Sequence, residues 1–233
     1  MFEIWIEIIV SVAVTFFGIL LILRFFKRGR YGKILWSVFK STFKESKVEL
    51  IKGKKTRYGL PDIYGKLDGR GVYIHPVPGK RGRNRESMTI AVENDIEISS
   101  DILISSPETS KIGDETIDLD VPNLNKYGYI VSSKKGKVED EAKRIFTKEV
   151  STKVHRLIED HKKNFRAVMV ESGLCLFSKF EWETDKQNLK DIIYRLKELS
   201  EELEKNADKI NEDFTNERLD YFYQGSYKKQ VDI

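Results

Sequence analysis

The chain has 233 residues and a formal net charge of +4 at pH 7, but this charge is unevenly distributed. Residues 24–55 contain 11 Lys or Arg against two acids, a net charge of +9, whereas residues 56–233 carry −3. The larger part of the chain is therefore mildly acidic, which gives no support for nucleic acid as a partner. The one cysteine, Cys175, excludes an intrachain disulfide, forms no zinc site by itself and suits a reducing cytoplasm.

Residues 1–27 are predicted to form a transmembrane anchor. No residue from Ile8 to Leu23 is charged, and the wider apolar stretch from Ile4 to Phe26 is about 34 Å long as a helix, enough for a hydrocarbon core of about 30 Å. A cleavable signal peptide is disfavoured because the start is acidic and no small-residue cleavage site follows. The basic flank predicts a single-pass protein of the cell membrane, with the N-terminus outside and the C-terminal domain in the cytoplasm.

Residues 28–47 are predicted to form a basic juxtamembrane amphipathic helix. Lysines fall in one narrow arc, while aromatic and aliphatic residues occupy the rest of the helix. We expect the apolar side to lie in the membrane surface and the lysines to attract anionic headgroups. The alternative is a helix packed on the soluble domain. The lysines in question are Lys33, Lys40, Lys44 and Lys47, and the residues expected at the membrane interface are Arg24, Lys27, Arg28 and Trp36.

Residues 48–215 are predicted to form one cytoplasmic α+β domain, in which a mainly antiparallel sheet is covered by two long helices. The dipeptide Asp68-Gly69 favours a hairpin turn between strands at 63–67 and 71–75. Further strands are expected at 88–92, 102–104, 117–121, 127–131, 165–170 and 174–180.

Two long helices are expected at 138–161 and 185–214. The second begins with a capping box at Thr184–Gln187 and continues as an apolar stripe, spaced by four and three, from Leu189 to Phe214. Packing against the sheet is the favoured interpretation, and self-association through helix 185–214 is the alternative. Residues 216–233 are predicted to be an aromatic C-terminal tail, which includes Tyr221-Phe222-Tyr223.

The loop from Gly79 to Arg85 is a candidate site for anions or lipid headgroups, because its cations could pair with phosphate. A solvated hairpin loop is the alternative. The cations are Lys80, Arg81, Arg83 and Arg85. An acidic region also contains Asp114, Glu115, Asp118 and Asp120, but it lacks the glycine-centred spacing of a calcium loop, so we predict no metal site there.

No catalytic residue, cofactor or metal is predicted. The three histidines, His75, His155 and His161, form no compact motif, and the chain has no Walker loop, nucleophile elbow or dinucleotide fingerprint. An enzyme is therefore disfavoured but not excluded. We interpret the chain as a membrane-tethered interaction module that contacts lipid and a protein partner. The alternatives are an accessory subunit of a membrane complex and, less favoured, an enzyme acting on a lipid or nucleotide.

Overall fold

The structure is a computed structural model that describes residues 2–55, 60–77, 86–98, 101–105, 115–116, 130–133, 139–206 and 208–209. Its helices are α1 (Phe2–Glu45), α3 (Glu139–Ile145), α4 (Lys148–Asp160) and α5 (Lys186–Leu203). Its longer strands are β1 (Glu49–Lys55), β2 (Pro61–Leu67), β3 (Arg70–Val77), β4 (Ser87–Glu93), β9 (Phe165–Glu171) and β10 (Leu174–Phe180). The short strands are β5 (Ile96–Glu97), β6 (Ile102–Ser105), β7 (Glu115–Thr116), β8 (Ile130–Ser133) and β11 (Asp208–Lys209).

Nine of the strands form one antiparallel sheet in the order β1-β2-β3-β4-β10-β9-β6-β8-β7. The predicted hairpin, which forms the second and third strands from the β1 edge, is confirmed. Asp68 and Gly69 form the turn between β2 and β3 with φ of 52° and 85°, the left-handed backbone that this dipeptide tolerates. The turn sets the register, so that Tyr64 lies opposite Tyr73 and Ile63 opposite Ile74.

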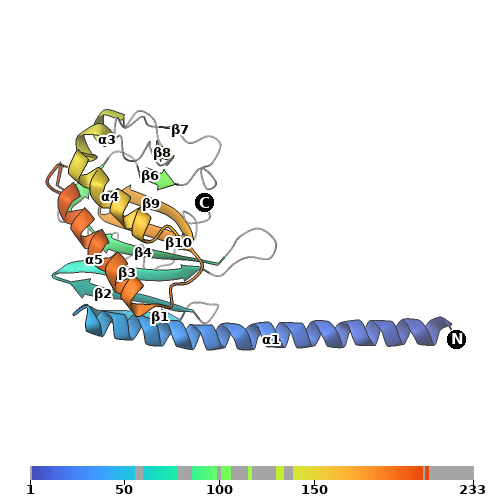
Figure 1. Ribbon diagram of the computed structural model, residues 1–233. Coiled ribbons are helices and arrows are strands. Elements are labelled where there is room, and N and C mark those ends of the chain that lie inside the picture. Colours follow the sequence, from blue (N-terminus) through green and yellow to red (C-terminus); the bar gives the residue numbers. More distant parts are fainter. Residues whose placement is uncertain are drawn as a thin grey trace.

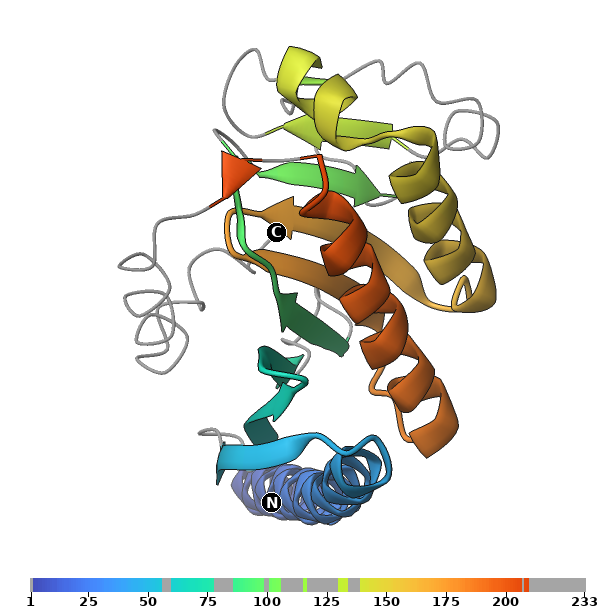
Figure 2. The same cartoon turned by 90° about the vertical axis from the view of Figure 1, so that its left-hand side faces the viewer.

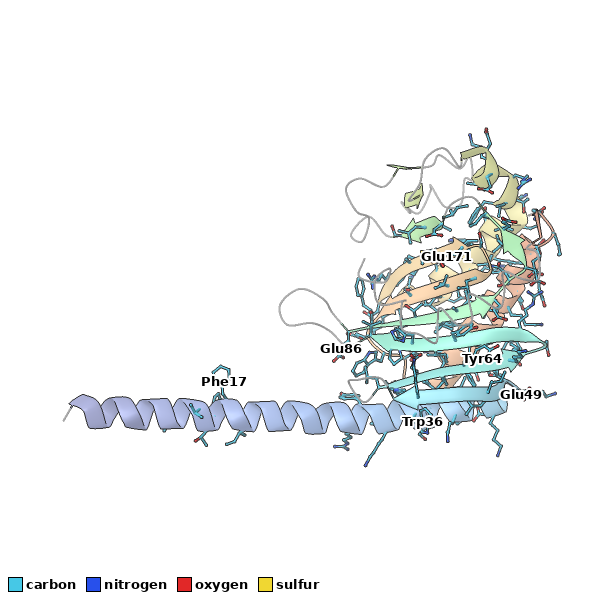
Figure 3. The ribbon with its side chains drawn as sticks, turned by 180° about the vertical axis from the view of Figure 1, so that it is seen from behind. Phe17, Trp36, Glu49, Tyr64, Glu86 and Glu171 are labelled. Carbon is cyan, nitrogen blue, oxygen red and sulfur yellow. The ribbon has the colours of Figure 1, made fainter. Side chains whose placement is uncertain are left out.

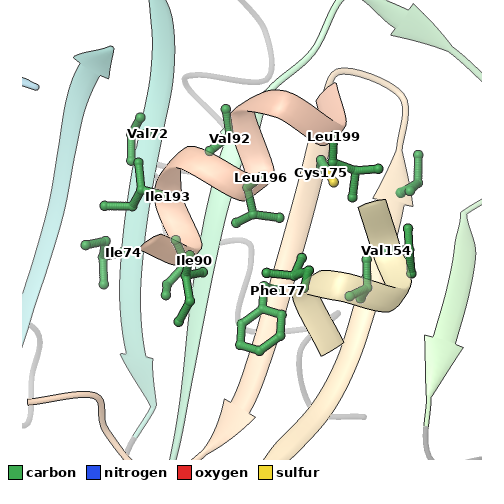
Figure 4. Close-up of a cluster of buried hydrophobic side chains, with 14 of the residues drawn as sticks. Val72, Ile74, Ile90, Val92, Val154, Cys175, Phe177, Ile193, Leu196 and Leu199 are labelled. Atoms are coloured by element: carbon green, nitrogen blue, oxygen red, sulfur yellow. The ribbon is translucent and has the colours of Figure 1, made fainter. Parts of the chain in front are cut away.

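The helices α4 and α5 cover one face of the sheet, and the second half of α1 closes the same core beside β1 and β2 (Figures 1 and 2). Alternate strand residues point into this core, as the period of two requires. Figure 4 shows Phe177 of β10 between Leu196 of α5 and Val154 of α4, with Ile90 of β4 close by. The expected α+β class with an antiparallel sheet is thus confirmed.

The helical predictions need two corrections. The run at 138–161 is two helices, because Thr147 interrupts it and caps α4 by accepting a hydrogen bond from the Val150 amide at 3.4 Å. The second long helix is capped by Asp185, one residue after the predicted Thr184, and ends at Leu203 instead of continuing to Phe214. Its described stripe is buried in the domain, which confirms packing against the sheet and leaves none of that stripe for a coiled-coil seam.

α1 runs without a break from Phe2 to Glu45 and so joins the two predicted N-terminal segments, 1–27 and 28–47, in one helix. Among the described residues, no helix combines the length and the apolar composition that a membrane crossing requires. Most side chains of residues 1–28, those of Arg24, Lys27 and Arg28 included, lie outside the described residues, so the anchor remains a prediction. The expected strand at 117–121 and the tail at 216–233 also lie outside them.

Candidate membrane-facing end of the domain

The second half of α1 belongs to the domain core. Leu35 and Phe39 are 0% exposed and Phe43 is 1% exposed, and all three join the cluster that contains the sheet and α5. This differs from the expectation that the apolar side of residues 28–47 lies in the membrane surface; the alternative, a helix packed on the domain, holds for that side. The reason is the close fit of the sheet edge: at Gly65, an added Cβ would lie 2.7 Å from the Phe43 ring.

Trp36 also contacts the domain. Its ring lies over Gly53 of β1, where an added Cβ would be 2.5 Å from the tryptophan Cη2 atom. The ammonium group of Lys40 lies 4.9 Å from the centre of the same ring, a cation–π contact. Figure 3 shows Trp36 where α1 runs beneath the sheet. The tryptophan that was expected at the membrane interface therefore joins α1 to the edge strand.

The continuous helix separates the predicted lysines along its axis. Figure 1 shows α1 as one straight rod that extends well beyond the domain. At 1.5 Å per residue, Lys33 lies about 8 Å beyond Arg28, Lys40 about 18 Å and Lys44 about 24 Å. These lysines are exposed, as is Lys47 beyond the end of the helix. A membrane surface that crosses the helix at Arg28 would have Lys33 within a Debye length of about 8 Å, whereas Lys40, Lys44 and Lys47 would lie farther away.

The basic loop begins at Val77, close to the point where α1 leaves the domain, and we call this starting point the root of the loop. The ring of Tyr31, three residues after Arg28, packs edge-on against Trp182 with 5.8 Å between ring centres. The indole Nε1–H of Trp182 donates to the carbonyl oxygen of Val77 at 3.3 Å, and Val77 is the last described residue before the loop. Figure 3 shows Glu86, on the other side of the loop, at the end of the domain from which α1 extends, with Glu49 at the opposite end.

A buried ion pair holds Trp182 in this position. The Lys179 ammonium lies 2.6 Å from Glu183 Oε2, and both side chains are buried. The other oxygen of Glu183 accepts the backbone N–H of Asp185 at 2.9 Å. The pair therefore ties the end of β10 to the start of α5 across the turn that carries Trp182. This arrangement fixes the loop root relative to α1.

The same end of the sheet gathers cations that are distant in sequence. The register places the end of β1 beside the start of β2, Val77 beside Ser87, Ser87 beside Phe180, and Lys179 beside Phe165. Lys54 of β1 is exposed, and so are Lys162 and Lys163 just before β9. The sequence alone does not indicate that these three lysines are neighbours, because only the strand order brings them together. The loop cations Lys80, Arg81, Arg83 and Arg85 themselves lie outside the described residues.

Two of the three histidines, His75 and His161, contact acids on separate elements. His161 Nε2 lies 2.9 Å from Asp191 Oδ2, an oxygen that also accepts from Arg195 Nε at 2.7 Å. His75 Nδ1 lies 3.4 Å from Asp62 Oδ1 on the neighbouring strand. Within the part of the chain that the structure describes, no group of three or more His, Cys, Asp or Glu side chains is placed to hold a metal ion. The acidic residues Asp114, Asp118 and Asp120 lie outside it, as does the side chain of Glu115.

Comparison with known proteins supports the fold alone. No protein-family model matches the chain, and no curated protein matches it in sequence. The solved structures include a similar one, the crystal structure of the mycobacterial trehalose monomycolate transport factor A, TtfA. The two chains are 12% identical and superimpose with a TM-score of 0.52, over 74% of this chain and 96% of that one. At this identity, the likeness establishes a shared arrangement of helices and strands.

Proposed function

We propose that this protein is a single-pass, membrane-tethered interaction module. The end of the sheet from which α1 extends lies directly on the inner leaflet. One observation carries the proposal: the helix that contains the predicted anchor is the same helix that enters the domain core. Among the described side chains of α1, Tyr31 makes the first aromatic contact to the domain, with Trp182, about 5 Å along the axis from Arg28. No flexible linker separates the anchor from the domain.

Charge supports this orientation. The inner leaflet is anionic and attracts each nearby Lys or Arg by about 1 kcal/mol. The loop 78–85 starts at a root next to Tyr31, and eight residues that leave and return reach about 13 Å from that root. The four loop cations, together with Lys33, therefore come within reach of the headgroups. In this orientation Lys40, Lys44 and Lys47 face the cytoplasm and take no part in lipid binding.

A role next to lipid is compatible with the structural neighbour. TtfA is named as a transport factor for trehalose monomycolate, a lipid. For the present chain, the corresponding proposal is an accessory protein that works at the membrane surface beside a lipid-handling complex. This joins the interaction module and the accessory subunit into one hypothesis. A pull-down from detergent-solubilised membranes tests it, because it predicts a stoichiometric membrane-protein partner.

Hydrogen exchange of the full chain in nanodiscs tests the lipid contact. We expect the segment 78–85 to exchange more slowly in discs that contain phosphatidylglycerol than in discs of phosphatidylcholine alone, and this protection to disappear at high salt. Reversing the loop charges (Lys80, Arg81, Arg83 and Arg85 to Glu) should abolish the difference.

The matched control reverses four exposed lysines at the opposite end of the domain, Lys44, Lys47, Lys66 and Lys205, which changes the net charge equally. This variant should keep the protection of segment 78–85. Equal exchange in both kinds of disc would reject lipid contact by the loop. Loss of protection in the control alone would instead favour a helix lying flat on the membrane.

Alkaline carbonate extraction tests the anchor separately. The full chain should stay in the membrane pellet at high pH, because a spanning helix is held by its apolar length and not by charge. Release into the supernatant would overturn the anchor and, with it, the proposed topology.

A further inference from the structure

The sheet has a second apolar cluster on the face opposite to α4 and α5. It consists of Tyr64, Tyr73, Ala91, Leu174 and Leu176, with Met169 packed against it, and we call it the far-face cluster. The register places these residues in one band across five strands: Tyr64 is opposite Tyr73, Tyr73 opposite Ala91, Ala91 opposite Leu176, and Leu176 opposite Met169. All of its members are strand residues, and none of the described helices contributes a side chain to it.

The far-face cluster is nevertheless buried. Tyr64 is 5% exposed, Tyr73 is 6% exposed and Leu176 is 1% exposed. Neighbouring side chains on a sheet shield one another from the sides, but they leave the outward ends of large residues open to water. Burial of two tyrosines to this degree requires a cover above them. Figure 2 shows α4 and α5 on the other side of the sheet, so neither provides it.

Polar contacts hold the cluster in a fixed shape. Glu93 accepts the Gly71 amide at 2.7 Å and the Tyr73 hydroxyl at 2.8 Å, and Tyr73 stacks on Tyr64 with 4.6 Å between ring centres. Burial, aided by the charge of Glu93, raises the pKa of Tyr64 to about 12. On the same face, Ser105 Oγ is buried without a hydrogen-bond partner among the described residues. A rigid apolar band with an unmatched hydroxyl beside it is suited to bind a peptide segment.

We propose that the C-terminal segment 210–233 of this chain is the cover of the far-face cluster. The described chain ends in β11, where Asp208 pairs with Glu97 and Lys209 with Ile96. Ile96 accepts the Gly173 amide at 3.0 Å, so the segment starts beside the turn that leads into Leu174 of the cluster. Its starting point is therefore at one border of the surface that it is proposed to cover.

Length and composition agree with this placement. From Ile96 to Ala91 is about 17 Å of strand, whereas the 12 residues from Lys209 to Tyr221 span up to about 40 Å. The run Tyr221-Phe222-Tyr223 therefore reaches the whole cluster, and aromatic rings pack well on stacked tyrosines and leucine. In the free protein this face is occupied, and a partner that uses it has to displace the segment. The proposal concerns the face of the sheet and does not depend on membrane contact at its end.

Thiol reactivity tests the proposal with an internal control. Ala91→Cys places a thiol within the far-face cluster, while the native Cys175 lies on the helix-covered side and is 0% exposed. We compare the full chain in detergent with a chain that stops after Lys209, and locate the maleimide adduct by mass spectrometry. Truncation should accelerate labelling at position 91 by about tenfold or more and leave Cys175 unlabelled. Unchanged labelling at position 91 would overturn the proposal, whether it is slow or fast in both chains.

Labelling of Cys175 would reveal that truncation unfolds the chain. In that case photo-crosslinking of the full chain tests whether segment 210–233 covers the far-face cluster. Benzoylphenylalanine replaces Met169 in the full chain. In a control variant it replaces Ile34, an exposed residue of α1. The probe at position 169 should attach to peptides within 210–233, and the probe at position 34 should not. Attachment of position 169 to residues 78–85 or 106–129, or to a second copy of the chain, would reject the C-terminal segment as the cover.

Discussion

Truncation of Phe39 tests whether the second half of α1 is part of the domain core. The side chain is 0% exposed and packs in the cluster that also contains Leu35 and Phe43 of the same helix. Phe39→Ala removes the whole ring from this cluster. If the helix instead lay in the membrane surface, the loss of the ring would not change the free energy of unfolding of the domain.

The expected effect is large compared with the stability of a domain. Phenylalanine-to-alanine changes in a core cost about 3–5 kcal/mol, because transfer and cavity terms add. Domains of this kind unfold with about 5–15 kcal/mol in total. At about 2–4 °C per kcal/mol for a domain of this length, the melting temperature should fall by about 10 °C.

Urea unfolding of the full chain in detergent measures this change, with near-ultraviolet circular dichroism as the signal. Ile34→Ala is the matched control, because Ile34 lies on the same helix and is 40% exposed. It should change the unfolding free energy by less than about 0.5 kcal/mol. A difference between the two variants below about 1 kcal/mol would refute the placement of α1 in the core.

Three further changes follow from described contacts. Lys179→Met leaves the buried Glu183 carboxylate without its cation, so urea unfolding should show a loss of about 3–5 kcal/mol, part of which Glu183→Leu restores in the double variant. Because the pKa of Tyr64 is raised from 10 to about 12, its contribution to stability is present below pH 10 and lost from there to pH 12. Tyr64→Phe should flatten that decline and remove one tyrosine from the part of the absorbance titration that lies above pH 10. Thr147→Ala removes the cap of α4 and should cost about 1 kcal/mol in the same assay, whereas the exposed hydroxyl of Thr152 can be removed with little effect.

The β-sheet region was the most predictable part of the fold. The turn at Asp68-Gly69 fixes the register of its hairpin, because positions that lie equally far from the turn face each other. The pairing of Tyr64 with Tyr73 could therefore have been read from the sequence, and with it the first two members of the far-face cluster. The order of the remaining strands could not, because it depends on long-range pairing. The sequence therefore does not predict that Lys162 lies at the same end of the sheet as Lys54.

The role of the second half of α1 could not be decided from its residues. A helix with aromatic residues on one side and lysines on the other suits a lipid surface and a protein surface equally well. What decides is the edge of the sheet, where Gly53 and Gly65 let Trp36 and Phe43 approach the strands. The end of α5 was missed for a related reason: its apolar spacing continues past Leu203, although the backbone turns there to form β11.

The shared helix also determines how the protein has to be studied. A fragment that starts at residue 48 lacks Leu35, Phe39 and Phe43, all of which are buried in the core. Such a fragment would lose both its membrane contact and its stability, so a failed partner interaction could not be assigned to either. A fragment that begins before Tyr31 keeps the core and the contact with Trp182 while it removes the predicted anchor. Comparing it with the full chain separates what lipid contributes from what the domain contributes, because only the anchor then differs between the two.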